Sequence, residues 1–300
     1  MTDLLSYHQG ELEVQRRAGV GSHGLAASDM YHPQMHTGVQ KYLSLQQLAI
    51  FSTGDGQGRM WASLRSGNPG FLRALDQSTL EVDGYSHPDD PLLKNLSLDS
   101  PAGMLAIHLA GRHRIRLNGT AHIQQDGKII LTTQQVYGNC PQYIQARTVG
   151  GARETSAAVA QEGDALDDSQ RQRIGKADTF FIATAYPSSG ADASHRGGKP
   201  GFVHAENGSQ LLIPDYSGNQ MFNTLGNIAA NPRAGLLFPD FETGAALQLS
   251  GSARILWDDP RMKEFAGAQR LLEFNIERVL DVPQATLLKF NFKSYSPTLP

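Results

Sequence analysis

The sequence predicts a mainly β protein with helices, of the α+β class, built from two tandem barrel-like modules. An internal repeat covers most of the chain, and each copy is predicted to form short strands separated by turn residues, with one helix between them. Small antiparallel barrels with helical additions typically show this pattern. The chain has 300 residues, of which 40% are hydrophobic. That amount of apolar material is enough to build two cores.

The repeat is visible when the chain is displaced by 131 positions. Residues 61–71 then align with residues 192–202, and seven of these eleven positions are identical. Between residues 48 and 85 there are 12 identities in 38 positions, where average residue usage would give about 2 or 3. With one more residue of offset the match continues, and Gly119 meets Gly251. Apolar periodicity alone would not align arginine, proline and glycine, so we infer a duplicated module.

The duplication predicts the domain boundaries. We expect an N-terminal arm with a helix at 1–39, a first module at 40–147, a linker that runs into a helix at 148–171, and a second module with a C-terminal extension at 172–300. Asp167 is a typical residue for a helix start, and it precedes the short body of the linker helix.

The two copies show the same order of expected elements. In the second copy, Asn207-Gly208 favours a hairpin, and Pro232 ends the helix. The strands expected there span 179–185, 201–205, 210–214, 234–238 and 246–256, with the helix at 219–231. In the first copy they span 48–53, 70–74, 79–83, 103–109 and 115–123, with a helix at 92–98. Gly251 would let a long barrel strand bend.

Four segments of the second copy, at 178–181, 193–202, 214–219 and 225–238, resemble the pyridoxamine 5′-phosphate oxidase-like, FMN-binding split-barrel family. The run Asn231-Pro-Arg-Ala-Gly-Leu-Leu-Phe238 is similar to the strand that follows the helix in that family. Residues 137–145 resemble a Cys-Pro-containing motif found in the same family. The resemblance implies that each module is a split β-barrel of the FMN-binding type. It also implies that the two modules form an intrachain pseudo-dimer, with FMN in the cleft between them.

The resemblance also implies which residues bind the cofactor. A dianionic phosphate matches a guanidinium fork, hydroxyl donors and free helix N–H groups. The family's phosphate-binding positions fall on side chains from the strand pair and from the start of the helix. Arg65, the first-copy counterpart of Arg196, is a further candidate, with a structural ion pair as the alternative. Tyr216 could contact the flavin, although core packing is its favoured interpretation. The strand-side residues are Ser194, His195, Arg196 and Lys199, and the helix-side residues are Asn219, Asn223 and Thr224.

The chain departs from the family at two places. The oxidases have an Arg-Lys pair where this chain has Asn223 and Thr224, and residues 294–300 do not resemble their arginine-rich, substrate-binding end. Oxidation of vitamin B6 is therefore disfavoured. The two copies also differ, because His195 corresponds to Leu64 and Lys199 to Asn68. We expect the second copy to carry the better phosphate site.

Other residues allow more than one interpretation. Arg196 could bind phosphate or form a structural ion pair, and the first interpretation is favoured because arginine binds phosphate in a planar, bidentate manner. Cys140, the single cysteine, could lie beside a flavin, although a buried and inert thiol is the more common case. His32 and His36 flank a proline and lack an accompanying glutamate, so we expect no metal site. Catalytic residues cannot be identified from spacing.

The function expected from these observations is FMN binding, with an FMN-dependent oxidoreductase activity on a small substrate or on oxygen and with NAD(P)H as donor. The alternatives are a non-catalytic protein that binds a flavin or another cofactor, and, less favoured, pyridoxamine 5′-phosphate oxidation. The net charge of −3 gives no attraction to nucleic acid or to anionic membranes. Without a secretory signal or a long apolar run, the sequence favours the cytoplasm. A homodimer is a further expectation.

Overall fold

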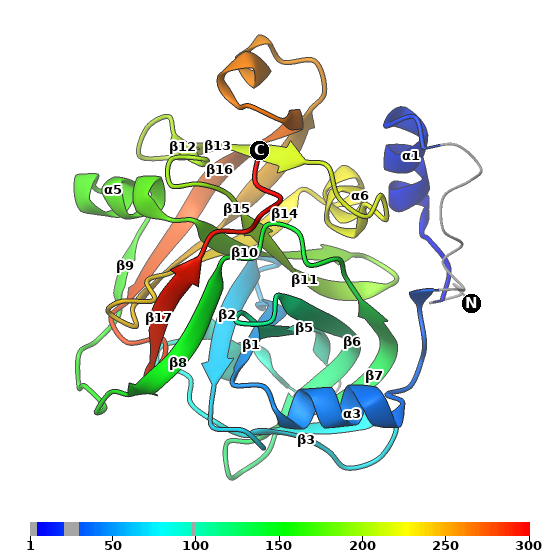
Figure 1. Cartoon of the computed structure of the whole chain (residues 1–300), viewed down its shortest axis with the longest axis vertical. Coiled ribbons are helices and arrows are strands. Elements are labelled where there is room, and N and C mark those ends of the chain that lie inside the picture. Colours follow the sequence, from blue (N-terminus) through cyan, green and yellow to red (C-terminus); the bar gives the residue numbers. More distant parts are fainter. Residues whose placement is uncertain (1–4, 21–29, 98–99) are drawn as a thin grey trace.

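The computed structural model describes residues 5–20, 30–97 and 100–300. These residues form two large antiparallel sheets with short helices at the periphery (Figure 1). The predicted fold class is confirmed, because strands dominate each half and each half closes around its own core. Residues 1–4 and 21–29 of the expected N-terminal arm lie outside the described residues.

The first sheet has seven strands in the order β2-β1-β5-β6-β7-β4-β3. Helix α3 precedes this sheet, and helix α4 lies between strands β4 and β5. The bounds are α3 (Thr37–Ser44), β1 (Leu48–Gly54), β2 (Met60–Ser66), β3 (Leu72–Ala74), β4 (Thr79–Val82), α4 (Pro91–Asn95), β5 (Ser100–His108), β6 (His113–Ile123) and β7 (Ile129–Gly138).

The second sheet has eight strands and repeats this order as β11-β10-β14-β15-β16-β13-β12, with β9 paired to β16. Each strand takes the place of its counterpart in the first sheet, which supports the inferred duplication. The bounds are β9 (Gln161–Gly163), α5 (Asp168–Lys176), β10 (Thr179–Tyr186), β11 (Gly190–Gly197), β12 (His204–Ala205), β13 (Gln210–Tyr216), α6 (Asn223–Ala230), β14 (Arg233–Pro239), β15 (Ala246–Leu256), the 3₁₀ helix η1 (Pro260–Glu264) and β16 (Ala268–Val282).

Both long strands have an irregularity at the glycine that the two copies share, and for Gly251 a bend was predicted. The register of β6 against β7 shifts between Asn118 and Gly119, and that of β15 against β16 shifts between Ser250 and Gly251. A Cβ atom on Gly251 would lie 2.0 Å from the carbonyl oxygen of Asn275. Only glycine permits this close approach. The glycine that occurs at the same position in both copies is therefore the residue that lets the sheet curl.

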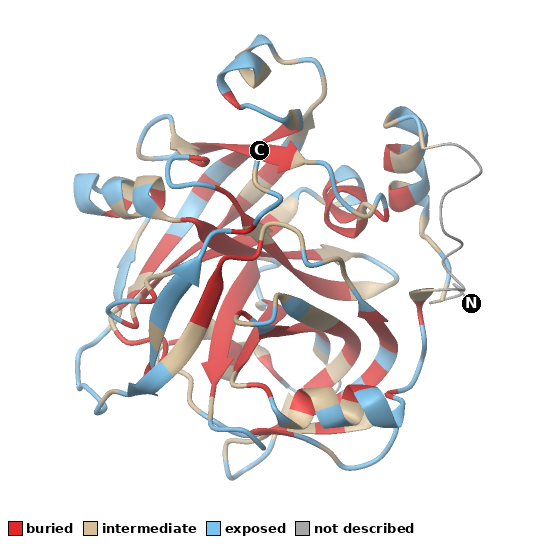
Figure 2. Cartoon of the chain, viewed as in Figure 1, coloured by how far each residue is buried: buried red, intermediate tan, exposed pale blue. Residues whose placement is uncertain are grey.

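The two modules pack face to face. A shared hydrophobic core lies between them, with Ile50 and Leu105 from the first sheet and Phe181 and Leu237 from the second; buried residues accordingly fill the centre of Figure 2. Gly103 and Gly235 are equivalent in the repeat, and each allows its strand to approach the backbone of the other module. Strand β8 (Ala146–Ala152) also pairs with β17 (Leu288–Ser294). The modules therefore form an intrachain pseudo-dimer.

The predicted elements are largely present, with clear differences. Helix α6 begins at Asn223 rather than at 219, because Gln220 and Phe222 have positive φ angles of 61° and 58° and keep the preceding segment irregular. The strands that were not predicted as separate elements are β2, β7, β8, β9, β11, β16 and β17, and two of them, β8 and β9, lie mainly in the segment expected to be a linker. The predicted helix start at Asp167 is confirmed, since its side chain accepts from the N–H of Gln170. The predicted 92–98 helix is α4 and ends at Asn95.

Helix α1 (Gln9–Arg17) belongs to the N-terminal arm and packs on α6 of the second module. The arm then crosses to the first module, where His32 exchanges backbone hydrogen bonds with Val136 of β7. The N-terminal arm thus contacts both modules. None of the helices in the described ranges has the length and hydrophobicity that crossing a membrane would require.

Candidate functional site

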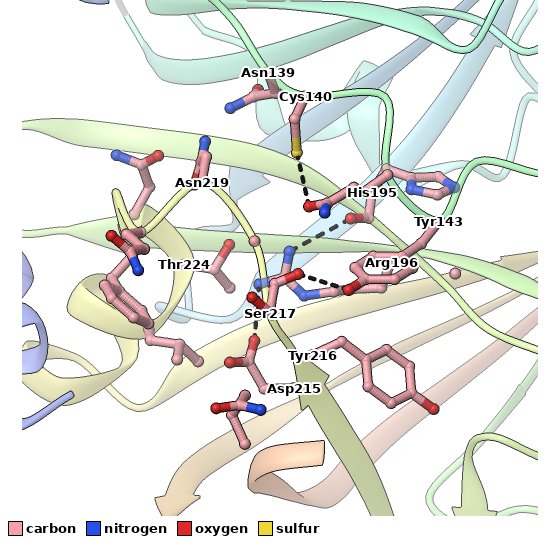
Figure 3. A pocket seen from close by; sticks show the side chains of 18 of the residues that line it. Asn139, Cys140, Tyr143, His195, Arg196, Asp215, Tyr216, Ser217, Asn219 and Thr224 are labelled. Atoms are coloured by element: carbon pink, nitrogen blue, oxygen red, sulfur yellow. Dashed lines mark hydrogen bonds and ion pairs between the residues drawn. The ribbon is translucent and has the colours of Figure 1, made fainter. Parts of the chain in front are cut away.

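A pocket of about 170 Å³ lies where the two modules meet. The second module contributes β11, β13, the start of α6 and the beginning of β16, while the first contributes β6 and the segment 139–143. Ala18 and Val20, at the end of α1, complete the wall. In Figure 3, Arg196 lies between Asn139 and Cys140 of the first module and Asp215 of the second.

Most of the residues predicted to bind the cofactor meet in this pocket. The residues that line it are His195, Arg196, Tyr216, Asn219, Asn223 and Thr224. Ser194 lies directly behind them, because its hydroxyl is 2.8 Å from that of Thr224. The fold therefore brings together seven of the nine residues that the sequence resemblance had indicated.

Two candidates lie elsewhere. Lys199 is exposed in the turn after β11 and is not part of the pocket wall. Arg65 is buried in the first module, where its guanidinium donates to the carbonyl oxygens of Asp83 at 2.7 Å and Gly127 at 2.8 Å. The structural interpretation therefore fits Arg65, whose hydrogen bonds join strand β2 to two loops of its own module.

Four arginines line the pocket, and the sequence indicated only one of them. Arg114 and Arg116 come from β6 of the first module, and Arg196 and Arg270 from the second. Their acidic partners are fewer. Asp192 holds Arg116 at 2.9 Å, whereas Asp215 lies 3.8 Å from Arg196 and 3.6 Å from Arg270. Positive charge therefore exceeds negative charge around the cavity.

Several buried donors in the pocket have no hydrogen-bond partner within the described part of the chain. They are Nε of Arg114, Arg116 and Arg196, Nε and Nη1 of Arg270, Nε2 of His195, and Nδ2 of Asn139. A buried donor left unpaired costs about 1–3 kcal/mol, and more when it is charged. A cluster of such donors around one cavity indicates a site built for an anion with several acceptor oxygens.

His195 is a neutral donor in this site. Burial, and next the charge of Arg114, hold its pKa well below the ordinary value for histidine. Nη1 of Arg114 is 3.1 Å from Nδ1 of His195, and a guanidinium can only donate. Nδ1 therefore accepts, and the proton is on Nε2, which is one of the unpartnered donors. Burial, followed by Arg116, lowers the pKa of Arg114 to about 10, so this arginine stays charged at neutral pH.

The start of helix α6 faces the same cavity. Phe222 at its N-cap position is left-handed and supplies no side-chain cap, so the first N–H groups and the helix dipole favour an anion there. Gln220, Phe222 and Tyr143 line the pocket and all have positive φ. Backbone strain of this kind concentrates at binding sites.

Helix α1 fixes the first residue of α6 through a carboxylate that the sequence did not reveal. Glu11 is buried and accepts from Nδ2 of Asn223, from the backbone N–H of His8 at 2.8 Å and from the Tyr31 hydroxyl at 3.4 Å. Burial raises the pKa of Glu11 to about 7. The only signal in the sequence was the capping pair His8 and Glu11, which predicts a helix start and not a contact 212 residues away.

Cys140 lies in the wall rather than in a core. Its thiol donates to Oε1 of Gln142 at 3.3 Å, and the residue is half-buried. Tyr143 donates to the carbonyl of Ser217 at 2.6 Å, and its ring lies 5.4 Å from that of Tyr216. The two modules are thus joined across the pocket by an aromatic pair and a hydrogen bond.

A wider hollow of about 650 Å³ shares Arg114 and Asn139 with the pocket. It lies between the N-terminal arm and strands β6 and β7. Both side-chain polar atoms of Asn139 are buried and lack a partner among the described residues. The shared wall therefore has unused hydrogen-bonding capacity between the two spaces.

Comparison with known proteins shows that the second module matches one family model. The family model described as "Pyridoxamine 5′-phosphate oxidase" matches residues 166–295. A search of curated proteins found no match.

Solved structures that match part of this chain include HupZ of Group A Streptococcus, at 12% identity and a TM-score of 0.34, over 41% of this chain and 98% of that one. They also include an FMN-binding protein of Syntrophomonas wolfei (10%, TM-score 0.29, 38% of this chain and 84% of that one). A FAD-binding protein of Mesorhizobium loti matches at 12% identity and a TM-score of 0.30, over 41% of this chain and 95% of that one.

The family model covers the strands, the helix and the segment around Arg196 on which the sequence resemblance rested. The second module therefore matches the model of the pyridoxamine 5′-phosphate oxidase family, in agreement with the resemblance that its sequence showed.

Proposed function

We propose that the pocket between the modules binds FMN, with the phosphate held by Arg196, Arg114 and Arg270 and by the start of α6. The observation that carries this proposal is the cluster of buried cationic and imidazole donors without partners. A phosphate dianion supplies several acceptor oxygens and two negative charges, and both match the excess of arginine over aspartate in the wall.

The surroundings also suit the rest of the cofactor. The pocket alone is small, but the adjoining hollow of about 650 Å³ is in the size range of small-molecule sites. Asn139, at the wall between them, offers an amide donor and acceptor to a polar heterocycle. FMN and FAD binding by proteins of similar fold is consistent with a flavin here.

A flavin in this position would supply hydride-transfer chemistry, while the chain's own residues bind and orient. His195 and Arg114 would donate hydrogen bonds, and α1 would cover one side of the site. We therefore propose an FMN-dependent oxidoreductase with a nicotinamide donor. The second candidate is a flavin-binding protein without turnover, which is favoured by the absence of an acid–base constellation among the described pocket residues.

Vitamin B6 oxidation is less well supported. Residues 294–300 carry no arginine, and this segment packs against the first module through Ser296, whose N–H donates to Gln145 at 2.8 Å. Residues 294–300 therefore pack on the first module, and they lack the basic side chains that would hold a second phosphate.

The test is an absorption spectrum of the protein after incubation with FMN and removal of the excess. Retained flavin bands are the expected result, and their absence would contradict FMN binding. Anaerobic addition of NADH or NADPH then separates the two candidates. Bleaching of the bound flavin supports the oxidoreductase, and an unchanged spectrum with both donors supports the non-catalytic alternative.

A further inference from the structure

The pseudo-dimer has a second location equivalent to the pocket. In the repeat, Ser63 corresponds to Ser194, Arg65 to Arg196 and Leu64 to His195. Helix α4 takes the place of α6, and β15 of the second module takes the place of β6. A symmetric pair of modules would therefore carry two anion sites, one at the start of each helix.

Asp90 occupies the helix start at this second location. It is the N-cap residue of α4, and its Oδ1 accepts from the N–H of Leu92 at 2.9 Å. The equivalent residue of α6 is Phe222, which supplies no cap. The first module thus places its own carboxylate where the second leaves the helix N–H groups free.

The carboxylate of Asp90 also accepts hydrogen bonds from side chains of the neighbouring strands. Its Oδ2 accepts from Nε2 of Gln248 at 3.0 Å, and it accepts from the Ser63 hydroxyl. Gln248 stands at the position equivalent to Arg116, and Ser63 at that of Ser194. All three side chains are at most 1% exposed, so no space is left beside them.

Two of the cationic donors of the pocket have uncharged counterparts at this second location. The counterpart of Arg114 is Ala246, and that of Arg116 is Gln248. Arg65 remains, but its guanidinium donates to the carbonyls of Asp83 and Gly127 and not into a cavity. Burial raises the pKa of Asp90 to about 6, so at neutral pH a negative charge is already present at this location.

We propose that Asp90 is a built-in anion that replaces the ligand phosphate and closes the first-module site, so that each chain binds one phosphate-bearing flavin at the second-module site alone. This inference rests on the proposed function, because it assumes that the open pocket is the phosphate site. The duplication has then produced one binding half and one structural half, each of which contributes strands to both locations.

Isothermal titration of the full chain with FMN, and separately with inorganic phosphate, counts the sites. One site per chain is expected, and Arg196→Met should weaken FMN binding there by about 10- to 100-fold and abolish detectable binding of the weaker ligand, phosphate. Arg65→Met should leave the count at one. Two sites, or one undiminished site in Arg196→Met, would overturn the inference. Binding of phosphate but not FMN at one site keeps the inference and overturns the proposed cofactor. Absence of binding by either probe overturns both.

A second variant tests Asp90 itself. In the Arg196→Met background, Asp90→Ser keeps a residue that can cap α4 but removes the carboxylate. We expect measurable phosphate binding to return, because Ser63, Gln248 and the helix N–H groups lose their anion. Asp89→Ser, next in the chain and partly exposed, is the matched control and should not restore binding. A folded Asp90→Ser variant that binds no phosphate would overturn the role of Asp90.

Discussion

At the scale of single residues, the site is distinguished by charged groups that the chain does not pair with itself. Arg147 and Asp178 show the ordinary case, in which a buried guanidinium lies 2.6 Å from its carboxylate. Arg196 and Arg270 instead share Asp215 at distances of 3.6 Å or more. Burying these guanidinium groups without a close partner costs free energy in the protein without ligand. A bound anion would compensate for this cost.

The first prediction concerns Arg196. Arg196→Met should weaken FMN binding by about 10- to 100-fold, the equivalent of one or two charge-assisted hydrogen bonds. Lys199→Met is the matched control, because Lys199 lies three residues away but is exposed and outside the pocket. Its Kd should change less than about twofold. Fluorescence titration measures both, and equal losses in the two variants would contradict the assignment of the pocket.

The second prediction concerns Glu11. Its pKa is raised from 4.5 to about 7, so between these values the folded chain retains a proton that the unfolded chain has released. Stability therefore falls as the pH rises through this window. Glu11→Gln removes the titration, and the variant should gain up to about 3 kcal/mol relative to the natural protein between about pH 5 and pH 8. Urea unfolding at the two pH values measures this gain, and a difference independent of pH would exclude it.

At the scale of elements, the contact of α1 with α6 decides whether the site is complete. The two helices touch through Gly10 and Gly226, where a Cβ atom on Gly226 would lie 2.6 Å from the backbone nitrogen of Glu11. This approach is what brings Glu11 to Asn223. The N-terminal arm is therefore part of the binding site, although it has no counterpart in the repeat.

The third prediction follows from that contact. Gly226→Ala should separate α1 from α6, lower the unfolding free energy by about 1–3 kcal/mol and weaken FMN binding. Gly175→Ala in α5 is the control, because no atom lies within 4 Å of the added methyl group. This substitution should stabilise the protein slightly, by roughly 0.5–1 kcal/mol. Thermal unfolding with and without FMN measures both, and a neutral Gly226→Ala would contradict the role of the arm.

The sequence predicted the elements with strong local signals. The Asn207-Gly208 hairpin, the helix start at Asp167 and the bend at Gly251 are all present, because turn residues and caps act over a few positions. It did not predict that β6 of the first module would supply Arg114 and Arg116 to a site in the second. These two arginines alternate with apolar residues as in any exposed strand, and only the packing of the modules brings them to the pocket.

At the scale of the whole molecule, the two modules share a hydrophobic core, so we expect them to unfold together. Leu105 and Phe181 are fully buried in it, one from each module. The same packing positions β6 beside α6, so the stability of the interface and the geometry of the pocket depend on each other.

The fourth prediction tests this dependence. Leu105→Ala should lower the unfolding free energy by about 2–5 kcal/mol and shift a single transition for the entire chain. FMN affinity should fall as well, although Leu105 is not part of the pocket wall. Leu45→Ala, which removes a 60% exposed side chain, is the control and should have little effect. Separate unfolding of the two halves in urea would show that they are independent.

The measurement that tests the central claim most directly is the affinity of the protein for FMN compared with riboflavin, by fluorescence titration under identical conditions. The two ligands share the flavin ring and differ only in the phosphate. If the unpaired donors around Arg196 and α6 form a phosphate site, FMN should bind at least about 100-fold more tightly, which corresponds to about 2.7 kcal/mol. Equal affinities would contradict this, and the arginine cluster would then require another anion.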